Sequence, residues 1–216
     1  SDVVEIAVDD AAAAGITCVS SVSNAARDTA VTRSYPADYE WVVGVGSVEH
    51  DGNGWIRSPY SDWGRSLRIT APGTNVTSLR YDGRQFGYAD GSGTSYSAAW
   101  VSGVCSLMHA KFGPRSNEWT ASRLCDTATD LAIGGGIGMG CGHRNDGLAA
   151  LIDARRAVCP ADFNADGFLD FFDYDDYVRC FETGDCPADT SADINLDGFA
   201  DFFDYDDFLA EFEAGC

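Results

Sequence analysis

The sequence predicts an α/β domain built on a parallel sheet over residues 1–158, followed by a small all-α module over residues 159–216. Two observations support this division. In the first part, short apolar segments of strand length alternate with segments of helical spacing, which is typical of a parallel sheet covered by helices. In the second part, an acidic segment returns after 31 residues, which indicates a duplicated unit.

The elements of the first part follow from local patterns. An alanine-rich segment at residues 2–14 has apolar residues at helical spacing, and Gly15 fits the position that ends a helix. Residues 41–48 are a dense apolar run that predicts a strand buried on both faces. We expect residues 49–66 to be loop and turn. Further strands are predicted at residues 16–22, 67–71 and 85–89, the last within a hairpin, and a helix at residues 95–111.

Charge is distributed unevenly along the chain. The net charge is −20, and residues 159–216 contain 17 acidic residues against a single basic one, Arg179. Such a segment repels itself and needs cations to stay compact, and it makes nucleic acid an unfavourable partner. No apolar run approaches the roughly 18 to 20 residues of a membrane helix. No signal peptide is visible, and we take the sequence as a fragment or a processed product.

The cysteines indicate an oxidising compartment. Four of the eight lie within the last 58 residues, a density that predicts disulfide bonds and a secreted or cell-surface protein. Sequence alone leaves the pairing open, and our hypothesis joins Cys180 to Cys186 and Cys159 to Cys216. The other four cysteines stand in apolar contexts, and we interpret them as buried thiols. They are Cys18, Cys105, Cys125 and Cys141.

The most informative segment is GTSYSAAWVSG, residues 93–103. Small residues before Ser95 allow a sharp turn, and Ser95 then begins the predicted helix. Its hydroxyl would lie at the positive end of that helix, where N–H groups without partners can stabilise a developing negative charge. The alternative is a serine that only caps a core helix, which is a common arrangement. Local chemistry favours the cap, whereas the order of the neighbouring motifs favours catalysis.

The segment resembles the G-T-S-x-A-x-P-x-V-x-G nucleophile motif of subtilisin-like serine proteases. Other segments resemble motifs of that family in the same order: ITCVSSVSN (16–24), SYPA (34–37), VGVGSV (43–48), SPYSDWG (58–64), ITAPG (69–73) and LIDA (151–154). Several motifs in the right order and spacing are far more specific than any one alone. The resemblance implies that residues 1–158 are the C-terminal part of a subtilisin-like parallel-sheet domain.

The same resemblance implies the roles of two residues. Ser95 would be the nucleophile of a serine endopeptidase, and Asn24 would donate a side-chain hydrogen bond to the oxyanion of the tetrahedral intermediate. If the family resemblance is set aside, the alternative is that Asn24 is a turn residue at the end of a strand. The substrate would be a protein or a peptide. Ala99, Trp100 and Ser23 depart from the family motifs, and we expect them to alter specificity, Ser23 by narrowing the pocket, without abolishing the chemistry.

Two members of the triad expected in this family are missing. Catalysis by a serine needs a general base beside it and a carboxylate that orients the base. The family carries both before the segment that this chain covers. The three histidines of the chain, His50, His109 and His143, stand in none of the family's motifs. We therefore expect the isolated chain to be inactive towards peptides.

The acidic repeat has the ligand pattern of a calcium loop. Oxygen side chains stand at loop positions 1, 3, 5, 9 and 12, a backbone carbonyl is expected at position 7, and glycine at position 6 allows the sharp turn. We therefore predict two calcium ions and a module that folds only when they bind. The alternative is a disordered acidic tail. The predicted ligands are Asp162, Asn164, Asp166, Phe168, Asp170 and Asp173, and then Asp193, Asn195, Asp197, Phe199, Asp201 and Asp204.

Aspartate at position 12, with no helix leading into the loop, resembles the dockerin family. Each loop is followed by a predicted helical stretch, residues 174–182 and 205–213. The family resemblance implies that loop positions 10 and 11 contact a cohesin-like partner. Here those positions are Phe171-Phe172 and Phe202-Phe203, unlike the usual small polar pair. These phenylalanines would form the module's own core, dock on the protease domain or bind a cell-surface protein.

The sequence therefore favours the C-terminal half of an extracellular serine endopeptidase with a calcium-binding anchoring module. The alternative is a non-catalytic protein in which a degenerate protease fold serves as scaffold for calcium-dependent adhesion.

Overall fold

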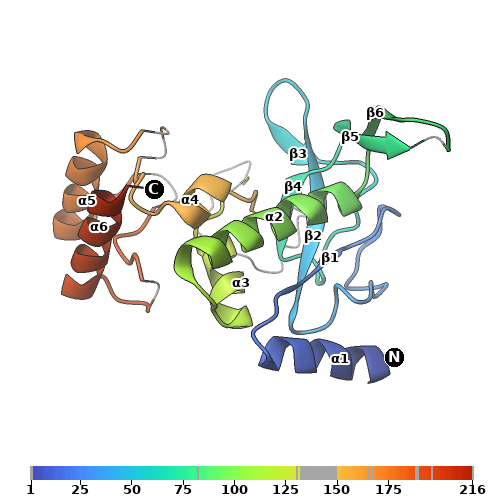
Figure 1. Ribbon diagram of the computed structural model, residues 1–216, viewed down its shortest axis with the longest axis horizontal. Helices are drawn as coiled ribbons and strands as arrows, with labels where there is room; N and C mark the ends of the chain where they lie inside the picture. Colours follow the sequence, from blue (N-terminus) through green and yellow to red (C-terminus); the bar gives the residue numbers. More distant parts are fainter. Residues whose placement is uncertain are drawn as a thin grey trace.

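The computed structural model describes residues 2–81, 83–129, 131, 150–164, 166, 168–187, 190–195 and 197–215. Its first part is a mixed α/β structure around a four-stranded sheet, with a separate two-stranded sheet (Figure 1). Strand β2 (Val42–His50) is the centre of the sheet and pairs in parallel with β1 (Cys18–Ser21) and with β4 (Ile69–Pro72). Residues 42–48 are all buried, as the apolar run predicts for a strand covered on both faces.

Two features of the β structure differ from the prediction or extend it. The predicted loop at 49–66 contains a short strand, β3 (Trp55–Arg57), which pairs antiparallel with the end of β2. The segment has no alternating apolar pattern that would predict a strand. Its hydrogen bonds with β2 make it one. Strand β6 (Phe86–Gly91) forms the predicted hairpin with β5 (Val76–Tyr81). The hairpin leads directly into the longest helix, so it sets where that helix begins.

Helices cover the sheet on the side seen in Figure 1. Helix α1 (Asp2–Ala13) ends before Gly15, which has a φ of +74°, as expected for a glycine that terminates a helix. Helix α2 (Thr94–Phe112) packs along β1, β2 and β4. Its buried residues Val101, Val104 and Met108 recur at helical spacing and join Ile69 of the sheet in the main core. Two shorter helices, α3 (Asn117–Asp126) and α4 (Ala154–Val158), complete this part.

Residues 161–215 have a second hydrophobic core of their own. Helices α5 (Phe171–Thr183) and α6 (Phe202–Ala214) pack through a stacked pair, Tyr177 on Phe208, with ring centroids 3.9 Å apart. Both helices start three residues earlier than predicted. Asp170 and Asp201 are the reason, because each caps its helix in a reciprocal capping box. The domain boundary at residue 158 stays a prediction.

The cysteines agree with the prediction in part. Cys180 and Cys186 form the predicted disulfide bond. Cys159 is disulfide-bonded as well, but its predicted partner Cys216 lies outside the described residues. Cys125 is also disulfide-bonded, so its interpretation as a buried thiol is wrong. Cys18 and Cys105 are free thiols, and burial raises the pKa of Cys105 to about 11; Cys141 lies outside the described residues.

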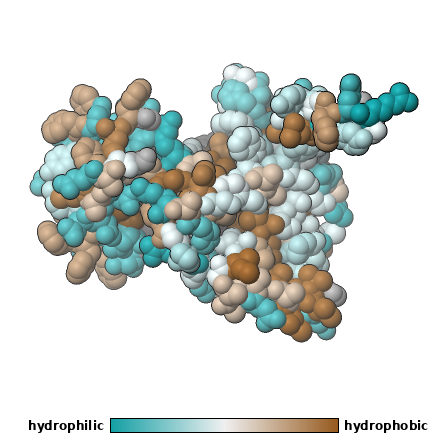
Figure 2. Space-filling model, in the orientation of Figure 1, coloured by the Kyte–Doolittle hydropathy of each residue, from teal (hydrophilic) through white to brown (hydrophobic). Residues whose placement is uncertain are grey.

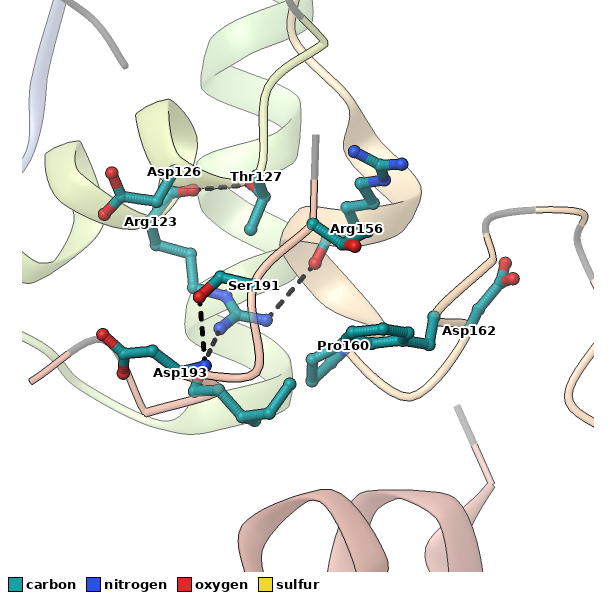
Figure 3. A pocket seen from close by; sticks show the side chains of 11 residues that line it. Arg123, Asp126, Thr127, Arg156, Pro160, Asp162, Ser191 and Asp193 are labelled. Atoms are coloured by element: carbon teal, nitrogen blue, oxygen red, sulfur yellow. Dashed lines mark hydrogen bonds between the residues drawn. The ribbon is translucent and has the colours of Figure 1, made fainter. Parts of the chain in front are cut away.

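The two parts meet at Arg123 of α3 (Figure 3). Its guanidinium is buried, lies over the ring of Phe112 at 4.9 Å, and donates to three backbone carbonyls. Ala157 and Arg156 accept within the first part at 3.0 and 3.3 Å, and Ile194 accepts from the acidic module at 3.4 Å. Burial lowers the pKa of Arg123 to about 10, so the residue remains charged at neutral pH.

Charged groups surround this junction. Lys111 of α2 forms an ion pair with Glu211 of α6 at 3.0 Å. Burial raises the pKa of the Asp126 carboxyl, and the neighbouring Asp193 carboxylate adds to the rise. A cavity of about 90 Å³ lies at this junction. It is lined by Arg123 and Asp126 from the first part and by Asp193 from the acidic module, among other residues (Figure 3). No helix within the described ranges is long and apolar enough to cross a membrane.

We expect Arg123→Ala to lower the free energy of unfolding by about 2 to 4 kcal/mol, because it removes a buried charge with three carbonyl acceptors. Chemical denaturation followed by circular dichroism measures the loss. Arg115→Ala is the matched control, since exposed Arg115 lies 5.2 Å over the Trp119 ring and should cost at most about 1 kcal/mol. Equal losses for the two variants would contradict this account of the junction.

Candidate active site

Two hydrogen bonds join the start of helix α2 to the end of strand β4. Gly93 donates its N–H to the carbonyl of Gly73 at 2.8 Å, and the hydroxyl of Ser97 donates to the carbonyl of Ala71 at 2.9 Å. A Cβ at Gly73 would approach the Ser97 hydroxyl to 2.3 Å and the Gly93 carbonyl to 2.9 Å. Glycine is therefore required at 73, because only a bare backbone allows strand and helix to come this close.

Ser95 is the second residue of α2 and is exposed to solvent. The first four N–H groups of a helix have no acceptor within the helix. The Ser95 N–H therefore points away from the helix body and stays available to a ligand. No side-chain hydrogen bond joins Ser95 to another described residue, so its hydroxyl is also available.

Asn24 lies next to Ser95 in space although 70 residues separate it from Thr94 in the chain. Its side-chain oxygen accepts hydrogen bonds from the Thr94 N–H at 2.8 Å and from the Thr94 hydroxyl at 2.9 Å. A backbone N–H can only donate, so the atom that faces it must be Oδ1 and the remaining amide nitrogen is a donor. That nitrogen, Nδ2, lies on the side of Gly93.

The structure thus brings the two predicted catalytic residues together. Asn24 Nδ2 lies on the side of Gly93, and the Ser95 N–H and exposed hydroxyl lie at the positive end of the same 19-residue helix. Such donors stabilise an oxygen that gains negative charge in the transition state of acyl transfer. The roles of Asn24 and Ser95 stay predictions, and so does the alternative that Asn24 is a turn residue.

A cluster of hydroxyl groups binds the backbone at Gly73, where β4 approaches the start of α2. Tyr60 donates to the Gly73 carbonyl at 2.7 Å, and its hydroxyl also contacts those of Ser47 and Thr74 at 2.8 and 3.0 Å. Thr74 in turn donates to the Glu49 carboxylate at 2.8 Å. These residues come from β2 and from the loops that precede and follow β4. Only Tyr60 lies in the SPYSDWG turn that the sequence singled out, and the hydrogen bonds of all four residues are visible only in three dimensions.

Comparisons with known proteins show the family of this chain. The sequence model described as the Subtilase family matches residues 1–143. The chain belongs to the subtilase family. The thermostable alkaline protease of Halalkalibacterium halodurans is 34% identical over 66% of this chain and 37% of its own length. Subtilisin DY of Bacillus licheniformis is 35% identical over 58% of this chain and 44% of its own length.

A solved structure shows the same fold. A protease from Pseudoalteromonas arctica superposes with a TM-score of 0.62 at 24% identity, covering 74% of this chain and 47% of that one. This chain therefore spans less than half the length of the subtilases that it matches.

The described histidines of this subtilase chain lie apart from Ser95, and His50 lies in strand β2, not in the loop predicted at residues 49–66. His50 ends β2, is exposed and packs edge-on against Trp55 with ring centroids 5.4 Å apart. His109 is in the last turn of α2, three to four turns from Ser95, and lies 3.5 Å from the Thr120 hydroxyl. His143 falls outside the described residues. Neither described histidine has a contact with Ser95.

Ser23 stands where the family motif has glycine, and the structure explains the preference. Its φ is +93°, a conformation that residues with a side chain rarely adopt. The serine therefore holds strained backbone immediately before Asn24. The predicted narrowing of the pocket by its side chain stays a prediction. The other departures, Ala99 and Trp100, are exposed in the second turn of α2 and leave the helix intact.

The predicted calcium loops of the acidic module have matching hydrogen bonds. Position-12 Asp173 and Asp204 are fully buried, and they accept the N–H of Asn164 at 3.1 Å and of Asn195 at 3.0 Å. The side chains at position 5 likewise accept the N–H at position 7 in both loops. Oxygen donors of this kind suit calcium. No three His, Cys, Asp or Glu side chains within the described ranges form a metal-holding group, and both sites stay predictions.

The phenylalanine pairs at loop positions 10 and 11 are exposed, not part of the module core. Phe171, Phe172, Phe202 and Phe203 are 67 to 70% exposed, and Phe168 and Phe199 are each 72% exposed. The core instead contains Phe163, Tyr177 and Phe208. These pairs therefore neither form the module's own core nor dock on the protease part.

We expect Ser23→Gly to raise the free energy of unfolding by about 1 kcal/mol, because glycine adopts a positive φ without strain. Thermal denaturation measures the change. Ser20→Gly in β1 is the matched control and should instead lower stability by about 0.5 to 1 kcal/mol, since strand backbone gains nothing from glycine. A Ser23→Gly protein less stable than the parent would show that the serine is not strained.

Proposed function

We propose that this chain supplies the nucleophile and the oxyanion hole of a secreted serine endopeptidase. The observation that carries the proposal is the contact between Asn24 Oδ1 and Thr94, which leaves two donors beside the Ser95 hydroxyl. The substrate is a protein or a peptide. Secretion is supported by the Cys180–Cys186 disulfide bond, since disulfides persist mainly in oxidising compartments.

In the proposed reaction, Ser95 attacks the substrate, and Asn24 and the Ser95 N–H stabilise the oxyanion. The Ser95 oxygen attacks the carbonyl carbon of the scissile peptide, and its proton passes to a histidine base supplied by the remainder of the protease domain. The carbonyl oxygen becomes negative and accepts hydrogen bonds from Asn24 Nδ2 and the Ser95 N–H. The tetrahedral intermediate then collapses, the amine leaves with the proton, and water releases the acyl group from Ser95.

The full-length protein should react at Ser95 with a fluorophosphonate probe, and Ser95→Ala should abolish labelling. Asn24→Ala should lower kcat by about 10² to 10³ with little change in KM, because the donor acts on the transition state. Ser102→Ala is the matched control, since Ser102 is an exposed serine of the same helix that bonds only to its own turn. An unlabelled full-length protein would favour the non-catalytic scaffold.

We further propose that residues 159–216 bind two calcium ions and anchor the protease to a partner. The oxygen donors at loop positions 1, 3, 5, 9 and 12, with the backbone carbonyl at position 7, would hold each ion. Bound calcium would offset the mutual repulsion of the carboxylates and so let the module stay compact. The two buried carboxylates at position 12 support this proposal.

Exposed phenylalanines on the anchoring module support a protein partner. Hydrophobic side chains protrude around the module in Figure 2, and six of them are the phenylalanines of the two loops and helix starts. Two pairs of adjacent, exposed phenylalanines on a strongly acidic module support an interaction site. The partner would be a cell-surface protein or a cohesin-like protein with apolar recesses between basic residues.

Isothermal titration should show two calcium ions per chain, and chelation should reduce the helical circular dichroism signal. Asp204→Asn should bind one ion, because it removes the position-12 ligand of the second loop. Asp206→Asn should still bind two ions, since Asp206 is an exposed aspartate of α6 outside the ligand pattern. A helical signal that chelator leaves unchanged, with no heat of binding, would contradict the calcium proposal.

A further inference from the structure

We propose that Asp62 is the positioning residue that holds Asn24 in place for the oxyanion. The inference rests on the proposed endopeptidase function, since it assigns a second residue to the same site. Asp62 lies in the turn after β3, in the segment SPYSDWG, and is fully buried. It does not touch Ser95, and it would act only through Asn24.

Asp62 binds the backbone on both sides of Asn24. Its carboxylate oxygen Oδ1 accepts the N–H of Ala25 at 2.9 Å, and its own N–H donates to the carbonyl of Ser23 at 3.1 Å. The peptide groups before and after Asn24 are therefore fixed by one residue. Thr94 meanwhile fixes the Asn24 side chain at Oδ1. Together the two contacts determine where the amide nitrogen points.

The carboxylate also contacts both the backbone and the side chain of Arg27. Oδ1 also accepts the N–H of Arg27 at 3.0 Å, and Oδ2 pairs with the Arg27 guanidinium at 3.2 Å. The Arg27 side chain is 45% exposed, whereas that of Asp62 is not exposed at all. Arg27 therefore covers the carboxylate and supplies the opposite charge that a buried carboxylate needs.

Other hydrogen bonds hold the rest of this loop but do not reach the peptide groups of Asn24. The Tyr60 carbonyl accepts the Ala26 N–H at 2.9 Å, and Trp63 bonds to the backbones of Arg27 and Thr29. These bonds would preserve the general path of the loop without Asp62. The strained Ser23, with its φ of +93°, persists only where its surroundings fix it. The Asp62 N–H donates to its carbonyl, and this backbone bond remains when the side chain is replaced, so the Asp62 variants test only the carboxylate contacts with Ala25 and Arg27.

Kinetics of the full-length protein test the role of Asp62. Asp62→Ala should lower kcat by about 10- to 100-fold and leave KM within about twofold, because a misplaced donor weakens transition-state binding alone. Asp62→Asn keeps one acceptor oxygen and should recover most of that loss. In an Asn24→Ala background, Asp62→Ala should change kcat by no more than about twofold, since the donor that it positions is already absent.

Asp51→Ala is the matched control. Asp51 also holds a loop by accepting two backbone N–H groups, those of Asn53 at 2.8 Å and Gly54 at 3.1 Å, but it lies in the β2–β3 turn. It should leave kcat unchanged. A folded Asp62→Ala protein with wild-type kcat, or one whose loss multiplies that of Asn24→Ala, would overturn the proposal. If Asp62→Ala does not fold, the same comparison is made with Asp62→Leu, whose side chain is of similar size and has no acceptor oxygen.

Amide hydrogen exchange separates this inference from the proposed function, because it needs no turnover. The amides of Ala25 and Arg27 should exchange at least about tenfold faster in Asp62→Ala than in the parent, as expected when a protecting hydrogen bond is lost. Asp51→Ala should leave them unchanged. A parent that does not react with the fluorophosphonate probe would refute the endopeptidase. Unchanged exchange at Ala25 and Arg27 would refute the role of Asp62, whatever the probe shows.

Discussion

The contact between Asn24 and Thr94 is the constraint on which the active site depends. It joins the end of β1 to the start of α2 across 70 residues of sequence, and it does so through two hydrogen bonds to one oxygen. Since that oxygen is occupied, the amide nitrogen of Asn24 must serve as a donor. The close approach of β4 and α2 at Gly73 fixes the start of the helix, whose second residue is Ser95. The sheet and the helix therefore act together as a rigid frame for two donors.

A buried charged residue also joins distant backbone segments at the junction with the acidic module. Arg123 satisfies backbone carbonyls from both parts, just as Asp62 satisfies backbone groups on both sides of Asn24. In each case a buried charged side chain replaces water for several main-chain groups at once, which fixes segments that are distant in sequence. The acidic module is thereby held to the subtilase domain by a buried contact, while its phenylalanine pairs remain exposed.

Sequence reasoning succeeded where a local pattern determines the structure. The apolar run of β2 and the GTS segment at the start of α2 gave these elements to within one or two residues. It failed where the structure depends on residues that are far away in the sequence. Strand β3 exists because β2 extends far enough to pair with it, and the roles of Asp62 and Arg123 depend on backbone groups more than 30 residues away. Asp170 and Asp201, assigned only as calcium ligands, also cap α5 and α6 and so start both helices early. Hydrophobicity alone left open where Phe171 and Phe172 lie, and they are exposed.

A crystal structure of the full-length protein with a peptide boronate tests the central claim most directly. The account predicts a covalent bond from boron to the Ser95 oxygen, with one boronate oxygen within about 3 Å of both Asn24 Nδ2 and the Ser95 N–H. The Asn24 Oδ1 contacts with Thr94 should be retained in that complex. A boronate oxygen that points away from Asn24, or an Asn24 amide that turns its nitrogen towards Thr94, would contradict the account.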